Sequence, residues 1–514
     1  MNYCSKEQQA DIVYYRPPWT CGRYTQNKHV AIMYNLIEGY VYFFEDISAD
    51  VIGRLLHSRR NEEFSLSRWS QETHVPEHEI ETFATLLESL GLVCTECPSP
   101  GYIHEYREQA KLKRKRDKQG LTISSDGEGN SAEKAYFEAI KAPNTITNVM
   151  FELTYNCSEK CLHCYNPGAT RNNDEKSFRH EREELTLQDY KRIIDELKEL
   201  GVVKVCLSGG DPFSKNIVWD IIDYLYQQEI AVDIFTNGQK LKGQEQKLSN
   251  YYPRLVGLSL YSGVPEDHDT ITRIQGSQKK TVDVMEELGK LGIPMNLKCC
   301  VMRPNVKSYY TVKEIAERTG AVPQFELNIT DSVEGDKCAS RHLRLTPEMM
   351  EIVLRDEYIE QSLNLREIAS KEMVIELGDK VCGAGENSFC ITPEGNLQPC
   401  CAFPLVLGNL RRNSLVEILN DNDTLHEWRS VTFSNFPECY TYDYCGYCRL
   451  CPGNNHVTNG TPFKPSENNC TIAKIKHTLA LKLKSGLDPL HGLTLKERLS
   501  QIDNREEILH REFK

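Results

Sequence analysis

The sequence predicts an α/β protein built around a parallel β-sheet that is curved or closed into a partial barrel of six strand-helix units. From Asn148 onward, short apolar runs alternate with amphipathic helical patterns, which is typical of parallel strands joined by crossover helices. A hairpin and three helical patterns precede this region, and a cysteine-rich segment follows it. These observations divide the chain into a small N-terminal domain, a central α/β domain and a cysteine-rich C-terminal domain.

Length and composition limit the class of protein. The 514 residues suffice for several domains, and no run approaches the roughly 20 apolar residues of a membrane span. The first residues lack the apolar region of an export signal, so we expect a cytoplasmic protein without a membrane partner. In such a chain the 20 clustered cysteines indicate metal ligation rather than disulfides. The net charge of −13 argues against a nucleic-acid partner.

Residues 1–97 are predicted to form a winged-helix-like domain. Two β-like runs, 30–36 and 40–44, are joined through Gly39 in a way that suits a short hairpin. Three helical patterns follow, at 48–57, around 66–69 and at 76–91. This shape serves nucleic-acid binding, peptide binding or a purely structural role. The third helix holds few lysines or arginines, which favours peptide binding.

Residues 98–147 are predicted to be a flexible linker. A charged helical stretch leads into a run of Ser, Asp, Gly, Glu and Asn at 124–131, a composition that cannot bury a core. The basic run KLKRKRDK at 111–118 is interpreted as a solvated helix face or part of the linker. A phosphate-binding patch is the alternative for this run.

Residues 148–345 are predicted to form the partial barrel. The expected strands lie at 148–155, 202–208, 230–236, 255–261, 294–302 and 324–330. The expected helices lie at 186–200, 216–228, 279–291 and 308–319. Chemistry in such folds takes place at the carboxyl ends of the strands.

A cysteine loop follows the first of these strands. Cys157, Cys161 and Cys164 are separated by three and then two residues. Three thiolates on one loop can hold three irons of a cubane cluster and leave the fourth iron open for chemistry. The alternatives are a zinc loop or plain buried thiols, although structural zinc requires four ligands and no second cysteine pair lies nearby.

Polar residues follow the next strands, and we expect all of them to face the same end of the sheet. They are the turn Ser208-Gly209-Gly210-Asp211-Pro212, then Asn237, Ser259 and Asn296. An ordinary β-turn and polar residues satisfying strand ends are the structural alternatives. At the end of the last strand, Glu326, Asn328 and Asp331 point toward the predicted site without an assigned role.

The region 346–470 is predicted to be a second cluster-binding domain with a bridging region, and 471–514 a helical C-terminal segment. The cysteines of this domain are Cys382, Cys390, Cys400, Cys401, Cys439, Cys445, Cys448, Cys451 and Cys470. Their order is that of a metal-binding array, and a pair of zinc sites is the alternative to iron-sulfur clusters.

The cysteine loop followed by the glycine turn resembles the radical SAM superfamily over 148 to about 330. The resemblance implies that Cys157, Cys161 and Cys164 hold a 4Fe-4S cluster whose open iron binds S-adenosylmethionine, the source of a 5′-deoxyadenosyl radical. It also implies that 208–212 contacts the methionine group, that Ser259 and Asn296 contact the nucleoside, and that Tyr165 shields the cluster. Asp211 departs from the glutamate usual in the family.

The C-terminal array resembles the SPASM extension, which carries two auxiliary 4Fe-4S clusters, so three clusters are implied in all. By resemblance, Cys439, Cys445, Cys448 and Cys470 hold one, and Cys382, Cys400 and Cys451 hold the other. Cys390, or else Cys401 or a substrate thiolate, completes the second. The central spacing of five, two and two departs from the family's two, five and three, which leaves the ligand assignment open.

Residues 31–56 resemble the precursor-recognition modules related to the small chaperone of pyrroloquinoline quinone biosynthesis, in which a leader peptide adds a strand to the hairpin edge. Together the three resemblances imply a peptide maturase, with thioether formation by a sactipeptide- or ranthipeptide-type synthase as the first expectation. A precursor peptide and a reductant such as flavodoxin or ferredoxin are the implied partners. Carbon–carbon crosslinking, epimerisation and a redox-sensing nucleic-acid-binding regulator are the alternatives, and no catalytic acid or base is assigned.

Overall fold

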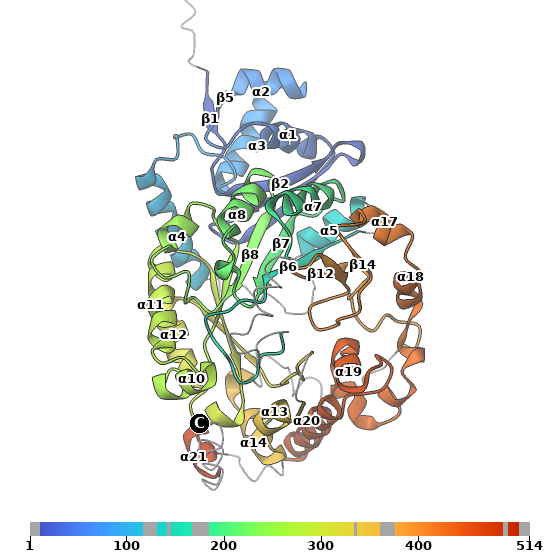
Figure 1. Cartoon of the computed structure of the whole chain (residues 1–514). Coiled ribbons are helices and arrows are strands. Elements are labelled where there is room, and N and C mark those ends of the chain that lie inside the picture. The colour runs from blue at the N-terminus through green and yellow to red at the C-terminus, as the bar shows by residue number, and fades with distance from the viewer. Residues whose placement is uncertain are drawn as a thin grey trace, which may run out of the picture.

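The computed structural model describes residues 11–116, 131–140, 145–166, 184–333, 337–359, 376–486 and 492–502 (Figure 1). Its centre is a mixed sheet with the strand order β11-β10-β9-β8-β7-β6-β12-β13-β14. The first six strands of the chain's central domain follow one another across this sheet: β6 (Asn148–Thr154), β7 (Lys204–Gly209), β8 (Ala231–Thr236), β9 (Leu255–Ser259), β10 (Met295–Cys300) and β11 (Val322–Glu326). Each pairs in parallel with the next. All six predicted strands are confirmed, with ends that differ by a few residues.

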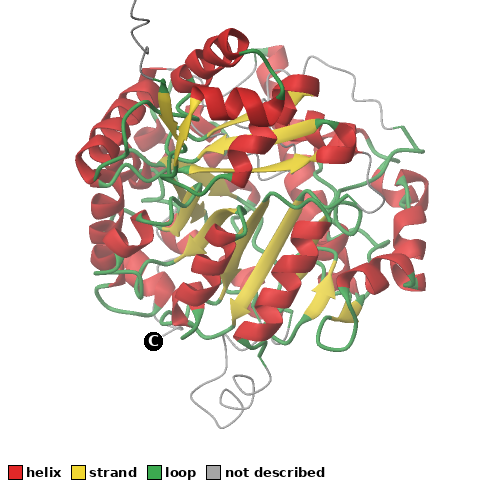
Figure 2. Ribbon diagram, turned by 90° about the horizontal axis from the view of Figure 1, so that it is seen from above, coloured by secondary structure: helices red, strands yellow, loops and turns green. Residues whose placement is uncertain are grey.

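The crossover helices also match the sequence pattern. They are α7 (Leu187–Glu199), α8 (Val218–Gln227), α11 (Ser277–Lys290) and α12 (Thr311–Thr319), with the shorter α9 (Glu245–Ser249) and α10 (Pro265–Thr272) among them. Helix α7 begins with a capping box in which Thr186 and Asp189 each bond the other's backbone N–H. Figure 2 shows helices, in red, packed beside the yellow strands of the sheet.

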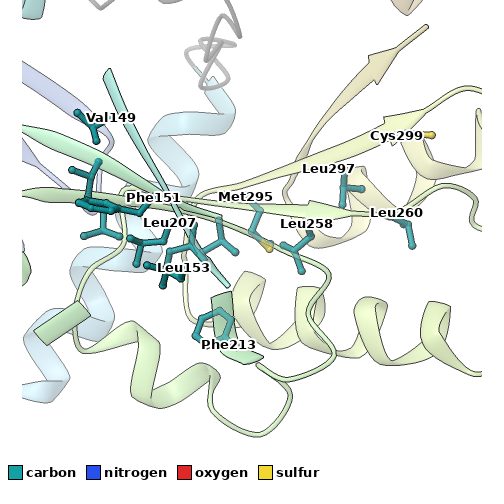
Figure 3. Close-up of a cluster of buried hydrophobic side chains, with 14 of the residues drawn as sticks. Val149, Phe151, Leu153, Leu207, Phe213, Leu258, Leu260, Met295, Leu297 and Cys299 are labelled. Atoms are coloured by element: carbon teal, nitrogen blue, oxygen red, sulfur yellow. The ribbon is translucent and has the colours of Figure 1, made fainter. Parts of the chain in front are cut away.

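Alternate side chains of the parallel strands point to opposite faces of the sheet. One set belongs to a large buried apolar cluster, part of which Figure 3 draws: Val149, Phe151, Leu153, Leu207, Leu258, Leu297 and Cys299. The crossover helices contribute to the same cluster. The intervening residues, such as Glu152, Ser208 and Asn296, therefore point to the opposite face, which we call the inner face.

The cysteine-rich domain is joined to this sheet rather than separate from it. Strand β12 (Ser388–Ile391) pairs in parallel with β6. Strand β13 (Asn396–Gln398) pairs antiparallel with β12, and β14 (Gly408–Asn409) pairs antiparallel with β13. The sequence pattern does not reveal this continuation, because a strand as short as β12 carries little periodicity and its pairing partner lies far away in the chain.

The N-terminal domain contains the expected hairpin and three helices. The hairpin strands are β3 (Val30–Asn35) and β4 (Tyr40–Glu45), and the helices are α1 (Asp46–His57), α2 (Leu66–Thr73) and α3 (Glu77–Ser89). An additional strand, β2 (Thr20–Thr25), makes a three-stranded sheet in the order β2-β3-β4, and β1 (Val13–Tyr15) pairs with β5 (Glu63–Ser65). In Figure 1 this domain lies at the top, beside α7 and α8.

The prediction of a flexible linker at 98–147 is wrong for two segments. Helices α4 (Pro100–Arg116) and α5 (Ser131–Ile140) are ordered because each buries aromatic residues, Tyr106 of α4 and Tyr136 and Phe137 of α5, against the N-terminal domain. Residues 124–130 of the Ser/Gly-rich run lie outside the described residues.

The basic run also differs from the expected solvated face. Arg114 donates to the carbonyl oxygens of Ile37 in the N-terminal domain and Gly292 in the central domain, and burial lowers the pKa of its guanidinium to about 10. Lys113 pairs with Glu38 at 2.6 Å. Helix α4 thus connects the N-terminal domain to the central domain (Figure 1).

The remaining helices follow the central sheet. They are α13 (Lys337–Leu343), α14 (Pro347–Val353), α17 (Leu415–Asn420), α18 (Asp423–Ser430), α19 (Pro452–Asn459), α20 (Glu467–Ser485) and α21 (Leu495–Ser500). Helix α20 is the expected C-terminal helix, and it ends at Gly486 in the left-handed conformation. In the parts of the chain that the structure covers, no helix has the length and apolarity to cross a membrane.

Candidate active site

The cysteine loop lies directly after β6, at the carboxyl end of that strand. Cys157 Sγ accepts hydrogen bonds from Asn237 Nδ2 at 3.2 Å and from the Glu159 backbone N–H at 3.4 Å. Cys161 Sγ lies 3.9 Å from the Tyr261 hydroxyl, which donates to it. Burial raises the pKa of the Cys157 thiol to about 12, so metal binding has to displace its proton. The loop is therefore held by residues that follow strands β8 and β9.

The glycine turn packs against the start of this loop. A Cβ on Gly210 would lie 2.5 Å from the Asn156 carbonyl oxygen, and Gly209 has a φ of +120°. The Gly210 N–H donates to the Thr154 carbonyl at 2.7 Å, and the Asp211 N–H donates to the Asn156 carbonyl at 3.0 Å. The glycines thus serve first to bring the turn against the cysteine loop.

Asp211 links the turn to the end of β8. Its carboxyl group is fully buried, and one oxygen accepts a hydrogen bond from the Thr236 hydroxyl at 2.5 Å. Its other oxygen has no hydrogen-bond partner among the described residues. Burial raises the pKa of this carboxyl to about 6.

Asn296 and Ser259 occupy the inner face at different depths. Asn296 is fully buried, and neither polar atom of its side chain has a partner in the part of the chain that is described. It pairs with Gly257 near the amino end of β10, so the expectation that it sits at the same end as the cysteine loop is wrong. Ser259 ends β9 and bonds the Tyr261 hydroxyl, which itself contacts Cys161.

The C-terminal cysteines form two groups. Burial raises the pKa of the Cys400 thiol, and the thiols of Cys401, Cys451 and Cys382, in that order, raise it further. Cys390 faces Met150 across β12 and β6, and the groups that raise its pKa besides burial are Glu152, Cys401, Cys400 and Cys206. The structure therefore brings Cys382, Cys400 and Cys451 together and leaves Cys390 on the inner face.

The other group surrounds a cavity. Cys439, Cys445, Cys448 and Cys470 all line a cavity of about 90 Å³ between the 433–450 segment and helix α20. These are the four cysteines that the resemblance to the SPASM extension assigns to one cluster. Besides burial, Cys448, Cys470 and Cys445 raise the pKa of the Cys439 thiol, which places the four thiols within electrostatic reach of one another.

The residues present fit the implied cofactors. Buried polar groups are normally paired, so the orphaned side chains of Asn296 and Asp211 are suited to an additional polar ligand. Across the described ranges, no three His, Cys, Asp or Glu side chains lie close enough to share a single metal ion. In a cubane cluster each cysteine binds its own iron, so thiols spread around a cavity suit a cluster.

Two family models match the chain. The Radical SAM superfamily model matches residues 151–309, and the SPASM model, an iron-sulfur cluster-binding domain, matches residues 382–452. The chain therefore contains a radical SAM domain followed by a SPASM domain. A radical SAM domain followed by a SPASM domain implies a cluster that binds S-adenosylmethionine and auxiliary iron-sulfur clusters.

The most similar proteins include enzymes with different substrates. The chain is 27% identical over 318 residues to the antilisterial bacteriocin subtilosin biosynthesis protein AlbA of Bacillus subtilis (strain 168), covering 59% of this chain and 66% of AlbA, just under two thirds of that protein. It is 24% identical over 341 residues to the AdoMet-dependent heme synthase of Methanosarcina barkeri (strain Fusaro / DSM 804), covering 62% of this chain and 95% of that enzyme.

A solved structure shares the fold over most of the chain. The crystal structure of Streptococcus suis SuiB bound to precursor peptide SuiA has a TM-score of 0.52 and 14% identity, and the match covers 89% of this chain and 99% of SuiB. At this identity the likeness concerns the fold alone. It extends well beyond the two regions that the family models match.

The sequence alone does not reveal two parts of the inner face of the sheet. Tyr165, expected only to shield a cluster, hydrogen-bonds Cys401, so the cysteine loop touches the SPASM region directly. Glu152 and Lys298 also point to the inner face, and burial lowers the pKa of Lys298. The alternation along β6 and β10 could have revealed both, since a charged residue in an apolar strand marks the inward position.

Proposed function

We propose that this radical SAM enzyme matures a ribosomally synthesised precursor peptide by joining a cysteine sulfur to a carbon of another residue. The observation that carries the proposal is the contact between Tyr165, next to Cys164 in the cysteine loop, and Cys401, next to Cys400. This contact supports a single reaction chamber in which a radical source and a sulfur-binding cluster meet.

The chain's own residues are suited to defined roles in this proposal. Cys157, Cys161 and Cys164 would hold the radical SAM cluster, and the bound cofactor would supply a radical that abstracts hydrogen from the peptide. Residues 208–212 would hold the methionine portion of S-adenosylmethionine. Ser259, at the end of β9, would contact its nucleoside, and Asn296 would reach the nucleoside from deeper on the inner face, supported by its orphaned amide.

The SPASM cysteines would hold two auxiliary clusters. Cys439, Cys445, Cys448 and Cys470 would complete one, which is supported by their shared cavity. Cys382, Cys400 and Cys451 would hold the other and leave one iron open for the substrate thiolate, since Cys390 lies on the inner face instead. A protein reductant of the flavodoxin or ferredoxin class would supply electrons in the cytoplasm.

The N-terminal domain would bind the leader of the precursor as an added strand. Strand β4 is an edge of its sheet, and an edge strand is the kind of element to which a peptide strand can be added. Phe44 of β4 contacts Phe83 of α3, with ring centres 6.1 Å apart, and Leu86 one turn later is 50% exposed. A leader on β4 would thus find an apolar surface on α3.

Co-expression with a short cysteine-bearing peptide encoded beside this gene tests the proposed function. Each thioether link removes two hydrogens, so the peptide should lose about 2 Da per link, and tandem mass spectrometry should map the link to a cysteine. A link between two carbons would give the same loss with all cysteines free to alkylation. Epimerisation would leave the mass unchanged, and either result would overturn thioether formation.

A second candidate is a small-molecule reaction, which the heme synthase relative favours because the match covers 95% of that enzyme. Such an enzyme has no use for a leader-binding domain. Isothermal titration of the purified protein with the leader peptide separates the two: micromolar or tighter binding supports the maturase, and no binding supports the small-molecule enzyme. Salt-dependent binding of nucleic acid would instead indicate a regulator.

A further inference from the structure

Glu152 is a buried carboxyl group on the inner face of the sheet. It is 4% exposed, and its neighbours in β6, Phe151 and Leu153, point into the apolar cluster on the other face. Its register partner on β7 is Ser208, the first residue of the glycine turn. Glu152 therefore lies on the inner face beside the first residue of the glycine turn.

The carboxyl group lies between the two cysteine regions. Its charge raises the pKa of Cys164 and Tyr165 in the cysteine loop, and that of Cys390 and Cys401 on the SPASM side. Coulombic effects of this kind fall off with distance. The geometry agrees, because Cys390 pairs with Met150, two residues before Glu152 on the same face of β6, and the cysteine loop follows β6 directly.

Glu152 has no ion-pair partner in the described ranges. Its Oε2 accepts a hydrogen bond from the Tyr155 hydroxyl at 3.0 Å, and Glu394, from the turn after β12, is the charged group that acts on it. Burial, opposed by this hydrogen bond and reinforced by Glu394, raises the pKa of Glu152 to about 7. Burying a carboxylate without a cation is costly, and such groups are concentrated at functional sites.

We propose that Glu152 is the base that accepts the proton of the substrate cysteine when the thioether forms. This rests on the proposed function. The acceptor carbon loses a hydrogen atom to the cofactor-derived radical, the substrate S–H loses its proton to the Glu152 carboxylate, and the carbon–sulfur bond forms. The one electron left over passes to an oxidised auxiliary iron-sulfur cluster, so atoms and charge balance.

The test compares Glu152→Gln and Glu152→Asp with the wild-type holoenzyme acting on its precursor. Wild type must first show the 2 Da loss, and its absence would sink the proposed function rather than the role of Glu152. Glu152→Gln should then form the link about 100-fold more slowly or worse, while 5′-deoxyadenosine production and leader binding persist. Glu152→Asp should recover part of the rate, and the exposed Glu287→Gln of α11 should match wild type.

Two results would overturn the inference. One is a Glu152→Gln variant that links at the wild-type rate, and the other is one that loses 5′-deoxyadenosine production together with the link, which would make Glu152 a cofactor-binding residue. Tyr155→Phe serves if Glu152→Gln does not fold. Because the Tyr155 hydrogen bond lowers the pKa of Glu152, its loss should move the pH midpoint of linking upward, and an unmoved midpoint would contradict the proposal.

An infrared titration of the purified full-length protein gives a readout that is independent of turnover. The difference spectrum between wild type and Glu152→Gln should contain a carboxyl band that titrates near neutral pH, and taking the difference removes the bands of other buried carboxyl groups such as Asp211. A difference spectrum without a titrating band would show that Glu152 keeps one protonation state throughout and would overturn its assignment as a base that is recharged at neutral pH.

Discussion

At the scale of single residues, burial controls the carboxyl group of Asp211. The folded protein binds its proton more tightly than the unfolded chain, since the pKa rises from 3.8 to about 6. The charged form therefore costs stability above pH 6, and this cost disappears as the pH falls through 6 toward 3.8. The same burial gives Asp211 an orphaned oxygen that a bound ligand can satisfy.

Replacing Asp211 with Asn should make the protein more stable at pH 7.5. The amide oxygen can still accept from Thr236, and a shift of about two pKa units corresponds to ~2 to 3 kcal/mol in the free energy of unfolding. Urea unfolding should show this gain shrinking toward pH 5. The exposed Asp220→Asn should run parallel to wild type at every pH, and a parallel curve for Asp211→Asn would contradict the prediction.

The two kinds of site residue differ in how far sequence could predict them. The cysteine loop and glycine turn are local motifs, and their spacing limits their geometry before any folding is considered. Glu152 and Cys401 are not parts of such motifs. Both residues act on Tyr165 of the cysteine loop, and they come near it only when the sheet is packed.

At the scale of elements, α3 and β4 form the surface that the leader is proposed to use. Leu86 is 50% exposed on α3, three residues after Phe83, so both lie on one side of the helix. Because Leu86 is exposed, replacing it should have little effect on folding. Its apolar side chain is then free to serve a partner.

Leu86→Lys should weaken leader binding about 10-fold, equivalent to ~1.4 kcal/mol, without a change in thermal stability. Fluorescence anisotropy with a labelled leader peptide measures the affinity. Leu112→Lys on α4, at a leucine that is 59% exposed, is the matched control and should bind as wild type does. Equal affinity of wild type and Leu86→Lys would exclude this surface of α3 from leader binding.

The linker shows why element prediction fails where polar residues are in excess. Helix α4 is rich in Lys and Arg, so its sequence indicates solvent exposure, yet Arg114 is held between carbonyl oxygens of two domains. A long basic side chain can bury its stem and still donate to backbone oxygens. The Lys and Arg content of a helix indicates solvent exposure, but it does not show whether the side-chain stems are buried.

At the scale of the whole molecule, three groups of cysteines lie around one sheet. The cysteine loop follows β6. In the second group Cys382 precedes β12 and Cys400 follows β13, two strands that extend the same sheet, and the third group lines the cavity beside α20. The direct pairing of β12 with β6 fixes the first two groups relative to each other.

Anaerobically purified protein should contain about 12 irons per chain if each group holds one 4Fe-4S cluster. Replacing Cys445 and Cys448 together with Ala should remove about four of them, while leader binding and 5′-deoxyadenosine production persist. Replacing the exposed Cys97 with Ala should leave the iron content unchanged. About four irons in the wild-type protein would contradict the three-cluster proposal, and the measurement is an iron assay with an ultraviolet-visible spectrum.

The sequence by itself determined the alternation of strands and helices, the order of the cysteines and the glycine turn, because each depends on residues that are neighbours in the chain. The tertiary structure alone decided that α4 and α5 pack between domains, that β12 extends the sheet from β6, and that Cys390 lies on the inner face beside Met150. It also placed Glu152 between two cysteine regions more than 200 residues apart in the chain. Such contacts depend on how elements pack, and local spacing carries no record of that.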